Sequence, residues 1–191
     1  SKMWITNASF ADVFLVLATT DASLKHKGVS CFIVEKDTPG LRIGKEEDKL
    51  GIRGTSTCEI HFENCRIPTN QRVNDEGMGF KIAMVTLNGG RIGIAAQALG
   101  IAQAAMDEAV KYALEREAFG QKISNFQSIQ FKLADMKSQI EGARLLVYKS
   151  AWKKDSGQDY STDSAIAKLI AAELASQVAD QALQIHGGYG F

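Results

Sequence analysis

The spacing of apolar residues along the chain changes near residue 72. Before that point, short runs rich in β-branched and aromatic residues alternate with polar positions, as in half-buried β-strands. These runs predict strands at residues 3–6, 13–19, 29–35 and 57–63. Segments such as Thr38-Pro39-Gly40 separate the runs and supply turns. We therefore expect a small antiparallel β domain.

After a polar loop at residues 69–77, apolar residues recur every three or four positions, as on one face of an α-helix. This spacing predicts three long helices, at about 80–116, at 127–155, and from Ser161, expected as the N-cap, to Gly187-Gly188. The expected apolar stripe of the first helix consists of Ile94, Leu99, Ala102, Met106, Val110 and Ala113. Small residues on the first and third helices would permit close helix packing.

Together the two halves predict an α+β fold, with an antiparallel β-barrel or sheet domain at residues 1–72 and a long-helix bundle at residues 73–191. A content of 45% hydrophobic and 23% charged residues is that of a folded globular protein. Basic and acidic residues number 22 each, and no Lys/Arg run exceeds two, so we do not expect nucleic acid as a partner. No apolar stretch approaches the roughly 18 residues of a membrane span.

Neither the cysteines nor the histidines are spaced like metal ligands. Cys31, Cys58 and Cys65 form no C-x-x-C pair and lie in apolar, strand-like segments, which fits free buried thiols in a reducing compartment. The three histidines are far apart and lack the H-x-x-x-H spacing of zinc-binding helices. We therefore expect no metal site.

Seven short strings in a fixed order are more specific than either half by itself. They are 4–7 (WITN), 47–57 (EDKLGIRGTST), 62–68 (FENCRIP), 77–80 (GMGF), 91–100 (RIGIAAQALG), 116–120 (REAFG) and 184–188 (QIHGG). Together they closely resemble the acyl-CoA dehydrogenases, most of all the short-chain, butyryl-type members. The resemblance covers the whole chain and matches the family's middle β-domain and most of its C-terminal helical domain.

The family's N-terminal helical domain and last helices have no counterpart in this sequence. The chain also opens with Ser1 on strand-like sequence and closes on the glycine-rich segment 187–191. We therefore expect an internal fragment of a longer protein.

The resemblance implies an FAD-dependent oxidoreductase that removes two hydrogens across Cα–Cβ of a short-chain acyl-CoA and gives the trans-2-enoyl-CoA. In this family a carboxylate base takes the α-proton, a hydride passes from Cβ to flavin N5, and the electrons go on to an electron-transferring flavoprotein. The resemblance also implies a homo-oligomer, expected as a dimer of dimers, in which one subunit completes the FAD site of another. The expected location is the mitochondrial matrix in a eukaryote or the cytoplasm in a bacterium.

The first expected cofactor-binding segment lies at the N-terminus. Trp4 and Thr6 are two residues apart on a predicted strand, so their side chains should share one face. The resemblance places this segment, including Ile5, along the flavin, with the Thr6 hydroxyl near N5. Taken alone, the residues favour instead a Trp buried in the sheet and a Thr selected for its β-propensity.

The second expected cofactor-binding region combines the ends of two helices. The resemblance directs Arg116 to the FAD pyrophosphate of a neighbouring subunit, with Phe119 packing on the cofactor and Gln127 hydrogen-bonded to it. A guanidinium fits phosphate oxygens, although Arg116 is equally a favourable cation at a helix C-terminus. The resemblance also brings a glycine-rich segment close to FAD, where the residues alone indicate a helix C-cap. This segment consists of Gln184, Ile185, His186, Gly187 and Gly188.

The resemblance assigns substrate binding to Asn88, Gly89, Gly90 and Arg91, although short-chain members commonly have an acidic residue at the position of Asn88. In this family the catalytic Glu is usually late in the chain, or, in the isovaleryl and long-chain branches, at the position of Gly90. Glycine cannot ionise. We therefore expect no catalytic residue in this chain, a Glu base beyond Phe191, and no activity from residues 1–191 alone.

Two alternatives remain open from the sequence. One is an acyl-CoA oxidase-like enzyme, which would pass its electrons to oxygen and reoxidise rapidly in air. The other is a non-catalytic relative used for assembly or binding, which would not respond to substrate at all. The absence of a Ser/His/Asp arrangement and of a G-x-G-x-x-G string after a strand argues against a hydrolase and a Rossmann dehydrogenase.

Overall fold

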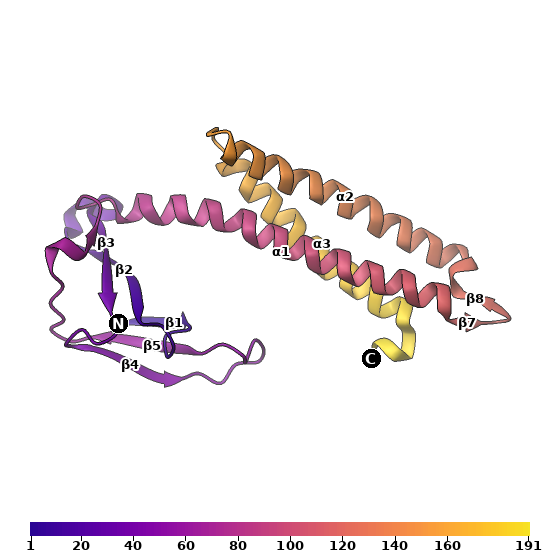
Figure 1. The fold of residues 1–191 in the computed structure, drawn as a ribbon, viewed down its shortest axis with the longest axis horizontal. Helices are drawn as coiled ribbons and strands as arrows, with labels where there is room; N and C mark the ends of the chain where they lie inside the picture. Colours follow the sequence, from indigo (N-terminus) through magenta and orange to yellow (C-terminus); the bar gives the residue numbers. More distant parts are fainter. The chain divides into compact units, whose positions relative to one another are not determined.

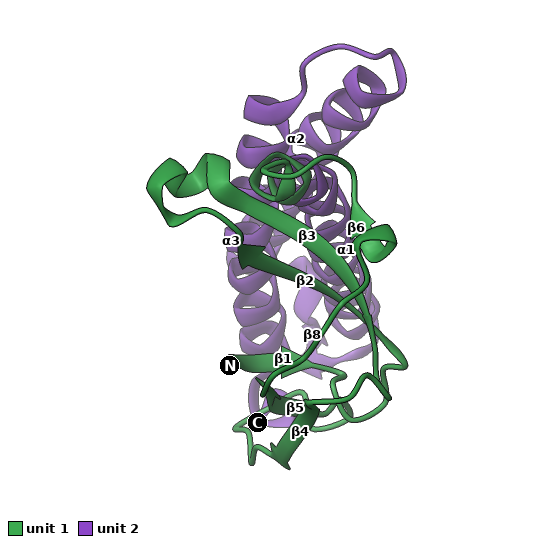
Figure 2. Ribbon diagram, turned by 90° about the vertical axis from the view of Figure 1, so that its left-hand side faces the viewer, with its two compact units in different colours: residues 1–84 green, residues 85–191 purple.

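A computed structural model describes all 191 residues, which form two compact units at residues 1–84 and 85–191 (Figure 2). The division between the units falls inside the first long helix, α1 (Gly79–Glu115). The observed elements confirm the expected fold class, in which antiparallel sheets precede long helices. The domain boundary between residues 72 and 73 stays a prediction.

Unit 1 contains two three-stranded antiparallel sheets, with strand orders β1-β5-β4 and β2-β3-β6. The strands are β1 (Lys2–Thr6), β2 (Val13–Thr19), β3 (Val29–Glu35), β4 (Leu41–Glu46), β5 (Thr57–Phe62) and β6 (Arg72–Val73). Two short 3₁₀ helices, η1 (Ala22–Gly28) and η2 (Thr69–Gln71), lie in the connections. β2 and β3 have the predicted bounds, whereas β4 and β6 were not predicted.

Successive side chains of a strand point to opposite faces, and the inward-facing ones form the core of unit 1. Phe14, Val34, Cys58 and Ile60 are buried there together with Ala8. Cys31 is also buried, but Cys65 is partly exposed, so the expectation of three buried thiols is wrong for Cys65. Cys65 lies in the loop after β5, where the alternation of a strand no longer turns its side chain into the core.

Unit 2 is built from the greater part of α1, α2 (Gln127–Asp155) and α3 (Ser161–His186) (Figure 1). Between α1 and α2 lie a small hairpin, β7 (Glu117–Ala118) and β8 (Gln121–Lys122), and the 3₁₀ turn η3 (Ile123–Asn125). A further 3₁₀ turn, η4 (Gly187–Gly190), follows α3. The three long helices are confirmed, with ends within one residue of those predicted.

Two details of the helices differ from the prediction. Ser161 is the first residue of α3 and not its N-cap, which is Tyr160. Asp159 Oδ1 accepts the Ser161 N–H at 2.9 Å and so satisfies one of the free N–H groups at that end of the helix. Ile94 does not belong to the buried stripe of α1, since about half of its side chain is exposed. Ala95 occupies the buried position instead.

The core of unit 2 is shared by all three helices and is dominated by alanine. Ten of its eighteen buried residues are alanines, among them Ala102 on α1, Ala143 on α2 and Ala171 on α3. The closest pair of helices is α2 and α3. The larger buried side chains, such as Met106 and Ile140, fill the remaining space.

None of the helices combines the length and the apolar character that a bilayer-spanning segment requires. Nor does the fold bring three or more His, Cys, Asp or Glu side chains together in the manner of a metal site.

The core predicts the effect of truncating its most enclosed large side chain. Ile140→Ala should lower the free energy of unfolding by about 2–5 kcal/mol, because Ile140 is fully buried and the helices can collapse only partly into the cavity. Leu145→Ala on the same helix is the matched control, since Leu145 is 68% exposed. Urea unfolding followed by circular dichroism measures both, and equal destabilisation by the two substitutions would contradict the observed packing.

An ion-pair cluster at the start of α3 predicts a pH dependence of stability. Hydrogen bonds from Lys153 and then Lys149 hold the pKa of Asp163 below its ordinary value of 3.8. A carboxyl with a lowered pKa in the folded state stabilises it above pH 3.8 and ceases to do so as the pH falls through the lowered pKa. Asp163→Asn should therefore unfold at lower urea concentration than the unsubstituted protein at pH 7, and the two midpoints should converge in acid. Asp155→Asn, without an ion pair, should show no such difference.

Candidate functional site

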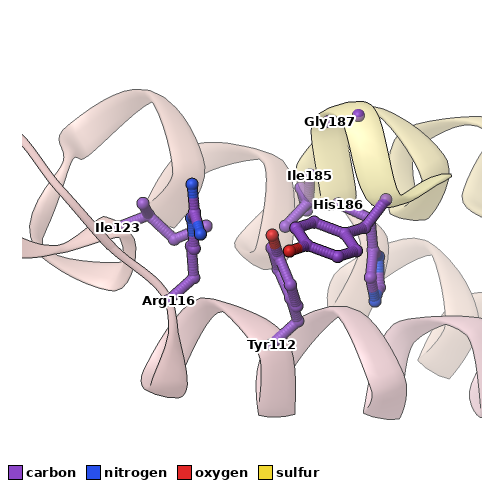
Figure 3. Close-up of a pocket in the computed structure, with 8 residues that line it drawn as sticks. Tyr112, Arg116, Ile123, Ile185, His186 and Gly187 are labelled. Atoms are coloured by element: carbon purple, nitrogen blue, oxygen red, sulfur yellow. The ribbon is translucent and has the colours of Figure 1, made fainter. Parts of the chain in front are cut away.

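A pocket of about 390 Å³ lies where α1 and α3 end and α2 begins (Figure 3). Side chains from α1, from η3 and from the end of α3 surround it. Its lining consists of Tyr112, Arg116, Ile123, Ile185, His186, Gly187, Gly188 and Tyr189. The pocket therefore unites Arg116 with the glycine-rich segment, two regions that the sequence separates by some seventy residues.

The end of α1 explains the position of Arg116. The Arg116 N–H still donates to the Tyr112 carbonyl oxygen at 2.8 Å, so these residues lie one turn apart on the same face. The hairpin β7–β8 then reverses the chain, and the Ile123 N–H donates to the Arg116 carbonyl oxygen at 2.9 Å. Local hydrogen bonds thus place Arg116 and Ile123 side by side at the pocket.

The end of α3 depends on Gly187. Its φ of +57° lies in the left-handed region, where a side chain would be strained. The Gly187 N–H donates to the carbonyl oxygens of Leu183 and Gln184 and so closes the helix. A Cβ placed on Gly187 or on Gly188 would meet no atom within 4 Å. The turn therefore presents bare backbone to open space.

Arg116 is the only permanently charged residue of the pocket lining, and its guanidinium has no carboxylate partner. The neighbouring acid, Glu117, pairs instead with Lys122 at 2.8 Å. The hydrogen bond from Lys122 lowers the pKa of Glu117 and keeps that carboxylate engaged. Arg116 Cζ lies 6.0 Å from the ring centroid of Tyr189. The guanidinium is consequently free to receive an anionic group.

These features fit a phosphate-bearing cofactor such as FAD. A free guanidinium can donate two parallel hydrogen bonds to phosphate oxygens, and the open glycine backbone allows close approach. The ends of α1 and α3 place partial negative charge near the pocket, and Arg116 offsets it. With about 390 Å³, the pocket would hold part of a dinucleotide and leave the rest outside.

Three of the residues expected at this site, Phe119, Gln127 and Gln184, do not line the pocket. Phe119 is 96% exposed at a φ of +52°, and its ring lies edge-on to that of Phe126 with the ring centroids 6.2 Å apart. Gln127 and Gln184 are exposed on α2 and α3. Ile185 is buried and joins the pocket to the helical core.

The segment expected along the flavin lies in unit 1. Trp4 and Thr6 are exposed, whereas Ile5 between them packs on the core. The pairing of β1 with β5 advances from Lys2↔Ile60 to Ile5↔Cys58, so β1 contains a bulge, and Trp4 adopts a φ of +60°. Bulges re-aim side chains, and a large aromatic residue at positive φ is uncommon. The residues alone favour a Trp4 that is buried in the sheet, and the exposed side chain shows that this interpretation is wrong.

The expected substrate segment lies on the first turns of α1 within unit 2. Arg91 Nη1 donates to Asn88 Oδ1 at 2.7 Å, which fixes the two side chains against each other. Helical structure continues through Gly89 and Gly90. A Cβ at Gly90 would meet nothing within 4 Å, whereas one at Gly89 would lie 3.6 Å from Lys154 Nζ. The helix face at Gly90 is thus open, whereas the face at Gly89 lies close to Lys154.

Sequence reasoning missed three lining residues, Tyr112, Ile123 and Tyr189. Tyr112 could have been found from its spacing, because it lies four residues before Arg116 on the same helix face. Tyr189 follows the glycine pair directly. Nothing in the sequence around Ile123 indicates its position, which depends on the hairpin.

Comparison with known proteins finds similar proteins over the whole length of the chain. Residues 77–191 match the family model described as acyl-CoA dehydrogenase, C-terminal domain, and residues 1–65 match the one described as acyl-CoA dehydrogenase, middle domain. The short-chain specific acyl-CoA dehydrogenase, mitochondrial, of Rattus norvegicus is 54% identical over 191 residues, which cover 100% of this chain and 46% of the rat protein.

Solved structures are also similar to this chain over nearly its whole length. The structure of butyryl-CoA dehydrogenase from Megasphaera elsdenii is similar at a TM-score of 0.94 and 52% identity, covering 100% of this chain and 50% of that chain. The structure of PigA with FAD and proline is similar at a TM-score of 0.95 and 36% identity, covering 99% and 49%. The chain therefore spans about half the length of the proteins it matches.

The free guanidinium predicts a specific loss of cofactor affinity. In the full-length protein, Arg116→Ala should weaken FAD binding about 10- to 150-fold, because a charge-assisted hydrogen bond contributes about 1.5–3 kcal/mol. Titration of the apoprotein with FAD measures the dissociation constant. Lys111→Ala, which removes an exposed cation of α1 that does not line the pocket, is the matched control and should leave the constant unchanged. If Arg116→Ala alters neither FAD affinity nor thermal stability, Arg116 is only a cation at the end of α1.

Proposed function

The chain belongs to the acyl-CoA dehydrogenase family, and from this premise we propose that the full-length protein oxidises short-chain acyl-CoA thioesters to trans-2-enoyl-CoA with FAD. The observation that carries the proposal is the 52–54% identity, over the whole chain, to dehydrogenases specific for short-chain and butyryl substrates. The pocket at Arg116 supports it, since its free cation and open glycine turn suit part of a dinucleotide cofactor.

The cofactor is assigned to two groups of residues. Arg116, with the backbone of Gly187 and Gly188, would bind the pyrophosphate, and Gln127, Gln184, Ile185, His186 and Phe119 would border it. Trp4, Ile5 and Thr6 would lie along the isoalloxazine, where the exposed Thr6 hydroxyl can donate a hydrogen bond. When bound, the flavin supplies the acceptor for the hydride from Cβ. The protein's own contribution is to bind, orient and hold polar groups at fixed positions.

Substrate binding is assigned to Asn88–Arg91. The 2.7 Å hydrogen bond holds Arg91 and Asn88 as one unit, and the exposed Gly90 leaves room for a thioester to approach the helix. Neither glycine nor an asparagine amide can take the α-proton. We therefore place the base, a Glu carboxylate, outside residues 1–191.

The remaining parts of the proposal concern electrons, assembly and location. Reducing equivalents would pass to an electron-transferring flavoprotein. The protein would work as a homo-oligomer, a dimer of dimers, whose neighbouring subunits share each FAD site. It would be found in the mitochondrial matrix of a eukaryote or the cytoplasm of a bacterium. An acyl-CoA oxidase-like enzyme is the second candidate, and rapid reoxidation in air would favour it.

Anaerobic titration with butyryl-CoA tests the proposal. The flavin absorption of the full-length protein should bleach on addition of substrate and recover slowly in air. Residues 1–191 supplied with FAD should not bleach, because loss of a general base alone costs roughly 10²- to 10⁴-fold in rate. The fold of the shorter protein is verified by circular dichroism. Absence of bleaching in the full-length protein would refute the dehydrogenase function, and bleaching by residues 1–191 would show that the base lies within them.

A further inference from the structure

A stack of two rings joins α1 to the end of α3 beside the glycine turn. Tyr112 and His186 lie with ring centroids 4.5 Å apart and planes inclined by 26° (Figure 3). Both side chains line the pocket, and Tyr112 also packs against the helical core. The stack therefore connects the rigid interior of unit 2 to a residue that immediately precedes Gly187.

The His186 ring is fixed at a second point. Its Nδ1 lies 2.8 Å from the carbonyl oxygen of Ala182. A carbonyl oxygen can only accept, so Nδ1 carries the hydrogen and donates it. One ring nitrogen thus ties the side chain to its own helix, while the ring face lies against Tyr112. Both rotations of the side chain are thereby restrained.

The same side chains continue toward the cation. The ring centroids of Tyr112 and Tyr189 lie 6.3 Å apart, and Arg116 Cζ lies 6.0 Å from the Tyr189 ring centroid. Tyr112 on α1 and Arg116 directly after it therefore lie against His186 and Tyr189, the residues on both sides of the Gly187–Gly188 pair. Neither glycine has a side chain, so apart from the hydrogen bonds of the Gly187 N–H to Leu183 and Gln184, these neighbours are what positions their backbone.

We infer that Tyr112 and His186 are positioning residues for the cofactor, an inference that rests on the proposed function. The stack and the bond from Nδ1 to Ala182 hold the glycine backbone at the distance from Arg116 at which both can contact the same phosphate-bearing group. Neither ring needs to touch the cofactor for this effect. Preorganisation of this kind lowers the ordering that binding would otherwise require.

The test uses the full-length protein and FAD as the probe. Tyr112→Leu and His186→Leu should each weaken FAD binding about 2- to 10-fold, the range to which the strength of an aromatic pair converts. The double variant should be little worse than either single one, because each removes the same stack. Tyr112→Phe keeps the ring and should retain the original affinity. Tyr148→Leu, an exposed tyrosine on α2 outside the pocket, is the matched control.

A second measurement does not depend on FAD affinity. Nitrogen-15 NMR of the apoprotein should show His186, when neutral, with its hydrogen on Nδ1. Tyr112→Leu should reduce this preference, whereas Tyr112→Phe should not. If Tyr112→Leu fails to fold, His186→Leu, at a half-buried position, gives the affinity result by itself.

The possible results separate the two proposals. If the unsubstituted protein binds no FAD, the proposed function fails and the inference falls with it. If the protein binds FAD and Arg116→Ala weakens binding, but Tyr112→Leu and His186→Leu do not, only the inference is overturned. The inference would also be overturned if the losses of FAD binding energy in Tyr112→Leu and His186→Leu added up in the double variant. The two side chains would then act independently and not as one stack.

Discussion

The hydrophobic core that α1, α2 and α3 share is the interaction on which the candidate cofactor site depends. No single helix holds the site, since Arg116 follows α1, Gly187 ends α3 and Ile123 precedes α2. A rotation of one helix against the others would carry Arg116 away from the glycine turn. The core resists such rotation because it is closely packed, and Ile185 belongs to the core and the pocket at once.

Alanine suits this task for a physical reason. It loses no side-chain entropy on burial and fixes the spacing of helices through its small volume, so the geometry depends on backbone contact rather than on rotamer choice. The few large buried residues, such as Met106 and Ile140, then determine the rotational register. A core of this composition transmits position accurately from the middle of the bundle to its end.

Strong local patterns explain why much of the fold could be predicted from the sequence. α2 has the predicted bounds because its apolar residues recur without a break, and β2 pairs with β3 over its full length. The strand β4 escaped prediction because Gly44 interrupts it near a bulge opposite β5. The strands β7 and β8 are too short to show a period.

The site shows the same limit at the level of single residues. Arg116 and the glycine pair carry recognisable chemistry, and these residues, which the resemblance assigned to one cofactor, line the same pocket. Ile94 was expected in the core because its spacing fits one helical face, but a three-helix arrangement buries only part of a long helix. The aromatic stack could not be predicted, because it joins residues 112 and 186. It depends on how α1 and α3 pack against each other, and the sequence does not indicate which of their residues meet.

The charges near the pocket indicate that these residues form one part of a larger site. A pyrophosphate diester carries two negative charges, whereas the lining provides a single permanent cation, Arg116. The C-terminal ends of α1 and α3 add partial negative charge, and only the N-terminal end of α2 opposes it. Balanced binding of such a group therefore requires donors from outside the pocket. A site divided between subunits meets this requirement, because each subunit then needs to supply only part of the compensating charge.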